Sequence, residues 1–420
     1  MKLLPFCPSP VLAALALLVP PAAAAESGGT FNPHLGQTVE ITRSHSWCWF
    51  PTIHRFRSGE ILVGVVMSPD QVNSEGAFSA YCLSRDGGQT WSRRYTLGVG
   101  ANQDGAWSEV PDENDQICQW GSYPEPARAG DDTHFTAIMT RYSHGGRRVA
   151  MDLDVGFRTA EPAALWPTWL FAYSFDHKLP IADTHILQQF GGRPWGNIIR
   201  GAHGELLCLC YYTSQADERR AQEEAKTTAS RHRYHLHNVL LRSDDGGRSW
   251  SEYGKIAAVP AGGRPSWMGD EGCGEGSLAL LPDGRLYAVY RTGGKGGIIG
   301  HAWSSDGGKT WSPPAPIGFS GVAPRIHRLS NGMLVLVTGR PGPVVMHFNP
   351  DGRGEKWTRE LTIYSDKSTH YTDVLEVEPG KLLVVYDHVP YGWYEIPFAD
   401  RDARNIIYGT FVDLGGEKAQ

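Results

Sequence analysis

The sequence has few of the features that mark several common classes of protein. Its 420 residues contain only seven cysteines, too few for a disulfide-dense scaffold, and beyond the N-terminus no apolar run is long enough to span a bilayer. The formal net charge is −6, so nucleic acid is not an expected partner. A glycine-rich phosphate loop, a Ser-His-Asp order and a basic tract are also lacking, and no cofactor is expected.

The N-terminus has the composition of a secretory signal. Lys2 supplies a positive charge, residues 11–19 form a short apolar run, and residues 22–25 are small, as at a cleavage site. We expect residues 1–25 to be a signal peptide, residues 26–420 to form one domain, and the mature protein to be secreted or periplasmic without a membrane span. Six cysteines then remain, for which one or two disulfides and buried free thiols are both open.

Glycine and proline are abundant, at 50 and 28 residues, which favours many short strands joined by tight turns. The pattern S-x-D-G-G-x-[ST]-W occurs three times, at residues 84–91, 243–250 and 304–311. Asp and Ser side chains bind nearby backbone in turns, the glycine pair allows positive φ, and the tryptophan can anchor the turn. The phrase therefore predicts three hairpin turns and is structural in itself.

A second, weaker repeat places a glycine turn before an apolar, β-rich run six times, at Gly59, Gly130, Gly204, Gly284, Gly332 and Gly380. Six units of four strands predict an all-β, six-bladed β-propeller. The expected blades are 46–100, 118–180, 195–258, 272–316, 321–361 and 370–414, with Thr38–Thr42 completing the last. Residues 214–233 interrupt the pattern and read as an inserted loop with some helix, either functional or merely solvated.

The repeated phrase resembles the Asp-box, or BNR repeat, of the sialidase (neuraminidase) superfamily, and the resemblance covers nearly all of the mature chain. The Asp-box also occurs in non-enzymatic propellers and in other glycosidases. It therefore supports the fold more strongly than the activity. An activity has to rest on particular residues near the central axis.

Three such residues match their family contexts. The segment His370-Tyr-Thr-Asp resembles the family's nucleophile segment, which puts the nucleophile at Tyr371. The segment Cys273-Gly-Glu-Gly-Ser-Leu, followed by Tyr290-Arg291, resembles the one that holds the partner glutamate and a substrate-binding arginine, here Glu275 and Arg291. Their separation of 16 residues (291 − 275) corresponds to one strand out and one strand back, so both side chains are expected at the same end of a hairpin.

The charge of sialic acid explains why the family uses a tyrosine as its nucleophile. Sialic acid bears a carboxylate on its anomeric carbon, which would repel a carboxylate nucleophile. A neutral phenol is not repelled but is weak at its free pKa of about 10. An adjacent glutamate acting as base makes it usable.

The family holds the substrate carboxylate with three arginines, because a planar guanidinium grips it bidentately. Besides Arg291, Arg340 is the second candidate and Arg325 a weaker rival. The third position departs from the family, since its Arg-Ile-Pro signature corresponds here to Trp49-Phe-Pro. Trp49 is expected either to stack on a sugar face or to pack within a blade, and the change puts sialic acid itself in question.

The remaining candidates are less specific. The family's acid/base is an aspartate in the loop after the first inner strand, where Asp70 is preferred over Glu75. Trp120, with Tyr123 and Glu125, is expected near the central funnel. The histidines at 232, 235 and 237 have metal-like spacing, but no carboxylate or cysteine cluster completes them, and no metal is expected.

Together these residues predict an exported, retaining glycosidase resembling exo-α-sialidases, with a glycan or glycoconjugate as its substrate. Two alternatives stay open. One is a related exo-glycosidase that acts on a different sugar, and the other is a non-catalytic carbohydrate-binding propeller.

Overall fold

The computed structural model describes residues 31–68, 78–99, 106–122, 128–129, 132–133, 136–158, 168–171, 186–189, 193–212, 223, 226, 235–247, 250–293, 297–394 and 396–415. The expected signal peptide and nearly all of the 214–233 insertion lie outside these residues and stay predictions. Within them, no helix is long and apolar enough to cross a membrane.

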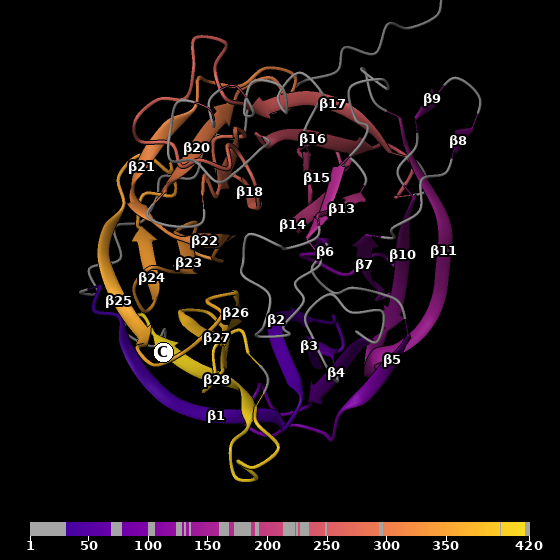
Figure 1. Cartoon of the computed structure of the whole chain (residues 1–420), viewed down its shortest axis with the longest axis vertical. Coiled ribbons are helices and arrows are strands. Elements are labelled where there is room, and N and C mark those ends of the chain that lie inside the picture. Colours follow the sequence, from indigo (N-terminus) through magenta and orange to yellow (C-terminus); the bar gives the residue numbers. More distant parts are fainter. Residues whose placement is uncertain are drawn as a thin grey trace, which may run out of the picture.

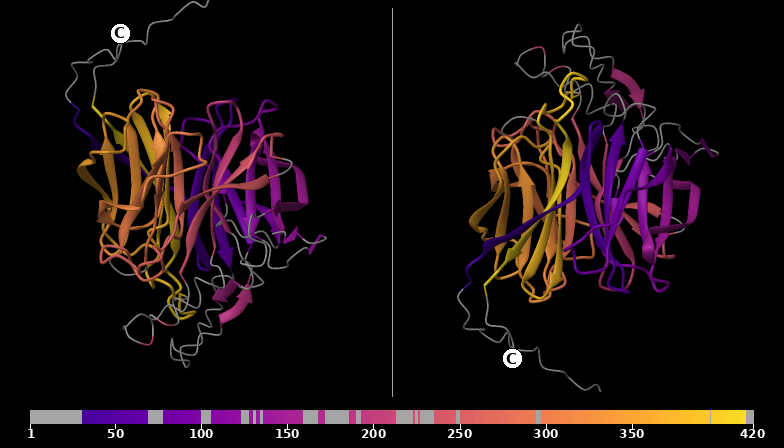
Figure 2. Two further views of the ribbon diagram at one scale, coloured as in Figure 1. Left: turned by 90° about the horizontal axis from the view of Figure 1, so that it is seen from above. Right: turned by 90° about the horizontal axis from the view of Figure 1, so that it is seen from below.

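The described residues form a ring of antiparallel sheets around a central axis (Figure 1), with the sheets standing nearly parallel to that axis in the side views (Figure 2). Three sheets consist of four consecutive strands each. They are β2(Trp47–Arg55), β3(Ile61–Ser68), β4(Phe78–Ser84) and β5(Tyr95–Val99); β18(Gly276–Leu280), β19(Leu286–Tyr290), β20(Ile298–Ser304) and β21(Ala315–Ser320); and β22(Val322–Arg328), β23(Leu334–Gly339), β24(Val344–Asn349) and β25(Thr358–Tyr364).

A fourth sheet joins the two ends of the chain, as predicted. It consists of β26(Thr372–Glu378), β27(Lys381–His388), β28(Asn405–Asp413) and β1(His34–Ser44). The expected closing segment, Thr38–Thr42, lies within β1 and pairs with β28. Val39 and Ile41 of β1 are buried in the core beneath this pairing, so the N-terminal strand closes the ring by both hydrogen bonds and apolar contact.

The predicted count of six blades is wrong, because the described residues form five large sheets. The fifth is an eight-stranded closed sheet of β6(Ala106–Ser108), β7(Ile117–Ser122), β10(Thr136–Ser143), β11(Arg147–Arg158), β14(Arg193–Arg200), β15(Leu206–Tyr212), β16(His237–Ser243) and β17(Trp250–Ala257). It combines most of the segments predicted as the second and third blades. Parallel pairing of β6 with β14 and of β11 with β17 joins them at both edges.

The other elements are short. The pairs β8(Arg128–Ala129) with β9(Asp132–Thr133) and β12(Thr168–Phe171) with β13(Ile186–Gln189) form two-stranded sheets. A single 3-10 turn, η1(His144–Gly146), is the only helical element named among the described residues.

The three Asp-box phrases form the hairpin turns that the sequence predicts. In the first, which links β4 to β5, Ser84 Oγ donates to Asp86 Oδ1 at 2.8 Å and accepts from Gly88 N at 2.8 Å. Trp91 Nε1 closes the turn on the carbonyl of Gly88 at 3.1 Å. The turns at 243–250 and 304–311 repeat these contacts between β16 and β17 and between β20 and β21.

Five of the cysteines, at positions 48, 82, 208, 210 and 273, are buried free thiols. Each lies in or beside a strand, and burial raises the pKa of the Cys48 thiol to about 12. The side chain of Cys118 lies outside the described residues.

Three inner strands carry the same irregularity where they reach the site. The pairing shifts between Trp49 and Thr52 in β2, between Trp195 and Ile198 in β14, and between Val322 and Arg325 in β22. In each strand, the residue at which the shift begins is followed by one with positive φ. These residues are Phe50 at 53°, Gly196 at 81° and Ala323 at 41°. Such β-bulges redirect side chains next to functional sites.

Candidate active site

Tyr371 and Glu275 meet at the axis from different sheets. Tyr371 directly precedes β26 and Glu275 directly precedes β18, and Tyr371 Oη donates to Glu275 Oε1 at 2.6 Å. Glu275 is 8% exposed, so this hydrogen bond forms largely out of water. The pair therefore has the geometry of a nucleophile held by its base.

Arg291 completes this group. It follows β19, whose pairing with β18 makes the hairpin that the 16-residue spacing predicts, and Arg291 Nη1 donates to Glu275 Oε2 at 3.0 Å. The same nitrogen lies 3.5 Å from Tyr371 Oη. Its other terminal nitrogen pairs with Glu271 Oε1 at 2.8 Å, so two carboxylates neutralise this guanidinium. Its expected role on a substrate's acidic group stays a prediction.

These contacts set the protonation of the pair. Burial alone would raise the pKa of Glu275, but the positive charge of Arg291 and the hydrogen bonds from Tyr371 and Arg291 lower that pKa below its ordinary value. Burial, together with the negative charge of Glu275, raises the pKa of Tyr371 well above its ordinary value. At neutral pH Glu275 is therefore ionised and Tyr371 keeps its proton.

The segment before Tyr371 is fixed by a buried carboxylate on β27. Asp387 accepts from Ser368 Oγ at 2.8 Å and from the backbone N of Thr369 at 2.7 Å, and also bonds to the Thr369 hydroxyl. It further accepts from the backbone N of Phe50 at 3.3 Å, which ties β2 to this segment. Asp387 thus positions Tyr371 although it does not touch the tyrosine hydroxyl.

Arg340 lies beside the aromatic ring of Tyr371. Its guanidinium carbon is 5.9 Å from the centre of the Tyr371 ring and 5.3 Å from that of Trp393, and Nη2 donates to the carbonyl of Thr369 at 2.7 Å. Both ring contacts are within the range of cation–π attraction. Arg340 therefore contributes positive charge beside Tyr371, and its expected substrate role stays a prediction.

Trp49 packs within the fold. Its indole is 1% exposed and meets Trp47, Phe50 and Trp393 edge to face, with ring centres 4.0, 5.7 and 5.0 Å apart. Of the two expectations for this residue, the contacts match blade packing, because no face of the ring is open to a sugar. The position that holds the family's first arginine is here part of an aromatic cluster beneath Tyr371.

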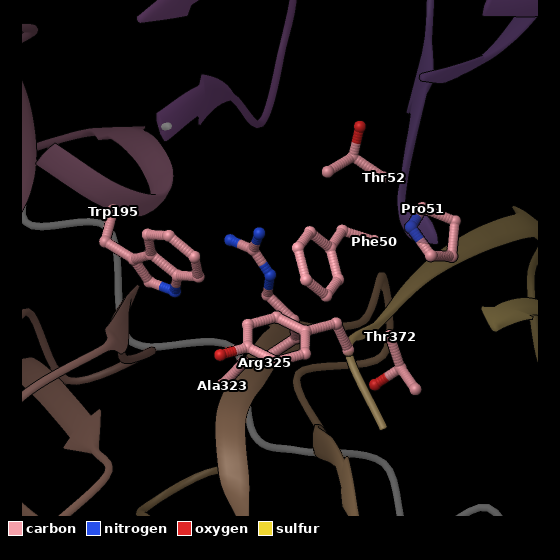
Figure 3. Close-up of a pocket in the computed structure, with 8 residues that line it drawn as sticks. Phe50, Pro51, Thr52, Trp195, Ala323, Arg325 and Thr372 are labelled. Carbon is pink, nitrogen blue, oxygen red and sulfur yellow. The ribbon is translucent and has the colours of Figure 1, made fainter. Parts of the chain in front are cut away.

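A narrow pocket opens beside Tyr371 (Figure 3). Eight residues line it, from β2, β14, β22 and the start of β26, and they include Thr52, Trp195, Arg325, Tyr371 and Thr372. The Arg325 guanidinium lies between the Trp195 indole and the Phe50 ring (Figure 3), with its carbon 5.9 Å from the centre of the indole. Arg325 is only 7% exposed.

A second charged group lies further along β22 and β26. It contains His327, two residues beyond Arg325, and Asp373, two residues beyond Tyr371. His327 Nε2 lies 3.1 Å from Asp373 Oδ1, and His327 Nδ1 lies 3.4 Å from Glu109 Oε1. Burial opposes the charged form of His327, but the hydrogen bonds to the two carboxylates raise its pKa to about 9. The charged His327 therefore links Asp373 and Glu109 into one ion-paired group on the inner strands.

Backbone conformation marks the same region. Five non-glycine residues among the described ones have positive φ. Four of them, Phe50, Ala323, Arg340 and His370, line the pocket or adjoin Tyr371. The left-handed region costs roughly 1–2 kcal/mol for such residues, and strain of this kind clusters at functional sites.

Several predicted site residues lie outside the described part of the chain. Asp70 and Glu75 belong to 69–77, and Tyr123 and Glu125 to 123–127. Trp120 lies in β7, but its side chain is not among those described. No group of three metal-ligating side chains occurs in the described ranges, where His235 and His237 are buried.

Sequence reasoning missed Glu271, Trp195, Trp393 and Asp387. Trp195 had a detectable signal, because Trp49-Phe-Pro-Thr-Ile, Trp195-Gly-Asn-Ile and Val322-Ala-Pro-Arg-Ile occupy equivalent bulges. Aligning these inner strands would have placed Trp195 and Arg325 together at the pocket. Glu271, Trp393 and Asp387 carry no motif that distinguishes them from ordinary turn and strand residues.

The comparisons with known proteins agree with this architecture. The BNR repeat-like domain family matches residues 195–384. This match covers less than half of the chain and agrees with a β-propeller built from such repeats. No curated protein sequence matches the chain.

Among solved structures, a Dyadobacter fermentans protein of unknown function shares 19% identity, with a TM-score of 0.61 over 91% of this chain and 99% of that chain. The Hadza microbial sialidase Hz136 shares 14% identity, with a TM-score of 0.56 over 87% of this chain and 66% of that chain. A Penicillium chrysogenum α-L-arabinanase, solved with arabinobiose, shares 15% identity, with a TM-score of 0.52 over 91% and 99% of the two chains. At these identities the likeness concerns the fold.

Proposed function

We propose that the protein is an exported, retaining exo-glycosidase that releases terminal sialic acid or a similar acidic sugar from glycoconjugates. The observation that carries the proposal is the part-buried Tyr371–Glu275 hydrogen bond of 2.6 Å, with Arg291 on the other oxygen of the glutamate. A surface or core tyrosine needs no ionised glutamate at its hydroxyl. A nucleophile that is weak at neutral pH does need one.

In this mechanism Tyr371 Oη attacks the anomeric carbon while its proton passes to Glu275 Oε1. Arg291 keeps Glu275 ionised until that moment, and the positive charges of Arg291 and Arg340 favour the developing phenolate. An acid, for which Asp70 is the first candidate, protonates the leaving oxygen. In the second step the deprotonated acid takes a proton from water, which attacks the anomeric carbon and breaks the tyrosyl–sugar bond. Glu275 returns its proton to the Tyr371 oxygen, and the two displacements retain the configuration of the sugar.

One observation favours a second candidate, an exo-glycosidase of the same fold that acts on a neutral sugar. The first family arginine is replaced by the packed residue Trp49, which removes one cation from carboxylate recognition. The α-L-arabinanase with the same fold shows that the architecture also accommodates a neutral sugar.

A panel of fluorogenic glycosides tests the two together, with an α-sialoside, a β-glucuronide and an α-L-arabinofuranoside offered to the mature protein and to Tyr371→Phe. We expect turnover of an acidic glycoside by the wild type and its loss in the variant. Turnover of the arabinofuranoside alone would favour the second candidate. Sugar binding without turnover, unchanged in Tyr371→Phe, would leave a non-catalytic carbohydrate-binding propeller.

A further inference from the structure

The two residues of the proposed reaction come from inner strands that are not neighbours. Glu275 precedes β18 and Tyr371 precedes β26, and β22 lies between these strands around the axis (Figure 1). The three strands belong to different sheets, so no strand pairing fixes their relative positions. Apolar packing between sheets is non-directional. Directional contacts are therefore needed to hold the Tyr371–Glu275 hydrogen bond at 2.6 Å.

Such contacts occur at two equivalent positions. Ser277, two residues after the proposed base, accepts through Oγ from the backbone N of Ile326 in β22 at 3.3 Å. Asp373, two residues after the proposed nucleophile, accepts through Oδ2 from the backbone N of Ile53 in β2 at 3.1 Å. Both side chains are buried. Side chains two residues apart along a strand lie on the same face, so each contact lies on the same side of its strand as the reacting group.

The two backbone donors are equivalent as well. The strands β2 and β22 are the edge strands of their sheets, so part of their backbone N–H groups lack a partner within the sheet. Ile53 and Ile326 each directly follow the residue at which a bulge ends, which is Thr52 in β2 and Arg325 in β22. The same contact between a polar side chain and a bulged edge strand thus forms twice, once beside each reacting residue.

Two further contacts extend this set around the axis. His327 Nε2 of β22 lies 3.1 Å from Asp373 Oδ1, which joins β22 to β26. Ser277 Oγ donates to Asn197 Oδ1 of β14 at 2.9 Å, and Asn197 Nδ2 donates to the carbonyl of Leu278 at 2.7 Å, which joins β14 to β18. Polar contacts therefore link β14, β18, β22, β26 and β2 in turn, and these are inner strands of all five large sheets (Figure 1).

We propose that three residues position the nucleophile and its base relative to each other, namely Ser277, His327 and Asp373. Ser277 holds the strand of the base against β22, and His327 with Asp373 holds β22 against the strand of the nucleophile. Among their described contacts none reaches the Tyr371 hydroxyl, so they act through the backbone. The proposal rests on the proposed function, because it assumes that the reaction occurs at the Tyr371–Glu275 pair.

The kinetics of two variants test this role. Ser277→Ala removes one contact without changing any charge, and His327→Gln removes the ion pair with Asp373. We expect kcat to fall by about 10–100-fold in each variant, with KM changed by less than about threefold, because the reacting groups are misplaced while the substrate still binds. Steady-state rates are measured at neutral pH on a glycoside that the wild type cleaves.

Thr410→Val is the matched control. Thr410 is buried, and among the described residues its hydroxyl bonds to Thr38 and Tyr386, which belong to the same sheet as Thr410. The variant therefore loses a buried hydroxyl that joins no two sheets. It should keep the kcat and KM of the wild type.

Fluorine NMR measures the placement of the pair without turnover. With 3-fluorotyrosine at position 371, the resonance of the Glu275→Gln protein marks an altered hydrogen bond to the tyrosine. We expect the resonance in Ser277→Ala and in His327→Gln to move from the wild-type position toward that of Glu275→Gln. In Thr410→Val it should stay at the wild-type position.

The outcomes separate this role from the proposed function. An unchanged kcat or an unchanged resonance in the folded variants overturns the positioning role. Loss of folding in both variants, seen by circular dichroism, overturns it as well, because the contacts would then hold the fold rather than the site. A shifted resonance in a protein that hydrolyses no glycoside supports the positioning of the pair and contradicts the proposed function alone.

Discussion

At the scale of single residues, the site depends on how the protein divides charge between Tyr371 and Glu275. Glu275 is buried and Tyr371 is partly buried, and only the glutamate is ionised, because Arg291 contacts it at 3.0 Å. Breaking such a contact leaves an uncompensated buried charge, which is more harmful than the loss of one surface ion pair. The same contact gives the glutamate its low pKa and so sets the pH range in which it can act as a base.

Glu275→Gln should therefore abolish most of the chemistry while keeping the shape of the site. We expect kcat to fall by about 10²–10⁴-fold, the usual range for a general base, with KM little changed. In the wild type the acidic limb of kcat/KM should lie below pH 4.5, the ordinary value for this group, because the folded-state pKa is lowered. Steady-state pH profiles measure both, and an acidic limb near pH 6 would contradict the assignment of the base.

At the scale of secondary-structure elements, two devices recur, the Asp-box turn and the bulged inner strand. The turn has a sequence pattern because its hydrogen bonds need particular side chains. The bulge has none, since Phe50, Gly196 and Ala323 share only their backbone conformation. The turns could therefore be predicted from the sequence directly, whereas the placement of Trp195 and Arg325 becomes apparent only when the three inner strands are aligned.

The two glycines of one turn offer a matched test. A Cβ at Gly88, where φ is 93°, would lie 2.5 Å from Leu383 Cδ2 in the core, whereas a Cβ at Gly87, where φ is 71°, meets nothing within 4 Å. Both Ala variants carry the strain of positive φ, but only Gly88→Ala overpacks the core. We expect Gly88→Ala to lose about 1–3 kcal/mol more of unfolding free energy than Gly87→Ala, as measured by chemical denaturation. Equal losses would contradict this account of the turn.

The ion-paired group on the inner strands predicts a pH-dependent stability. Because the pKa of His327 is raised from 6.5 to about 9, its contribution is fully present below pH 6.5 and is lost as the pH rises through 9. By linkage, the raised pKa stabilises the folded protein below pH 6.5 by about 3 kcal/mol, relative to a variant that does not titrate. The group is coupled to Asp373 and Glu109, and His54 and Arg325 also face Asp373.

Urea unfolding of wild type and His327→Gln between pH 6 and 9.5 measures this effect. The wild type should be the more stable at pH 6, and the difference should shrink toward pH 9.5. A difference that stays constant over this range would show that His327 is neutral in the folded protein.

At the scale of the whole molecule, stability depends on closing the ring with the N-terminal strand. A chain that starts at residue 45 lacks β1, which leaves β28 as an open edge and uncovers the core beneath Val39 and Ile41. We expect a lower thermal midpoint, faster hydrogen exchange of the β28 amides, and aggregation on concentration. A chain that starts at residue 31 is the control, and equal midpoints for the two would contradict closure by β1.

The sequence also predicted the β-propeller class, four of its sheets and the proximity of Tyr371, Glu275 and Arg291, because turn motifs, a hairpin spacing and the resemblance of short segments carried that information. It did not predict the joining of the second and third units, since this depends on parallel pairing between residues far apart, such as Phe157 with Trp250.

The proposed mechanism requires Tyr371 to form a covalent bond to the sugar. The most direct measurement is mass spectrometry of the protein quenched during turnover of a glycoside that it cleaves, followed by digestion and sequencing of the modified peptide. The account predicts a peptide containing Tyr371 that is heavier by one glycosyl group, and no such adduct in Tyr371→Phe. An adduct on another residue, or full turnover by Tyr371→Phe, would contradict it.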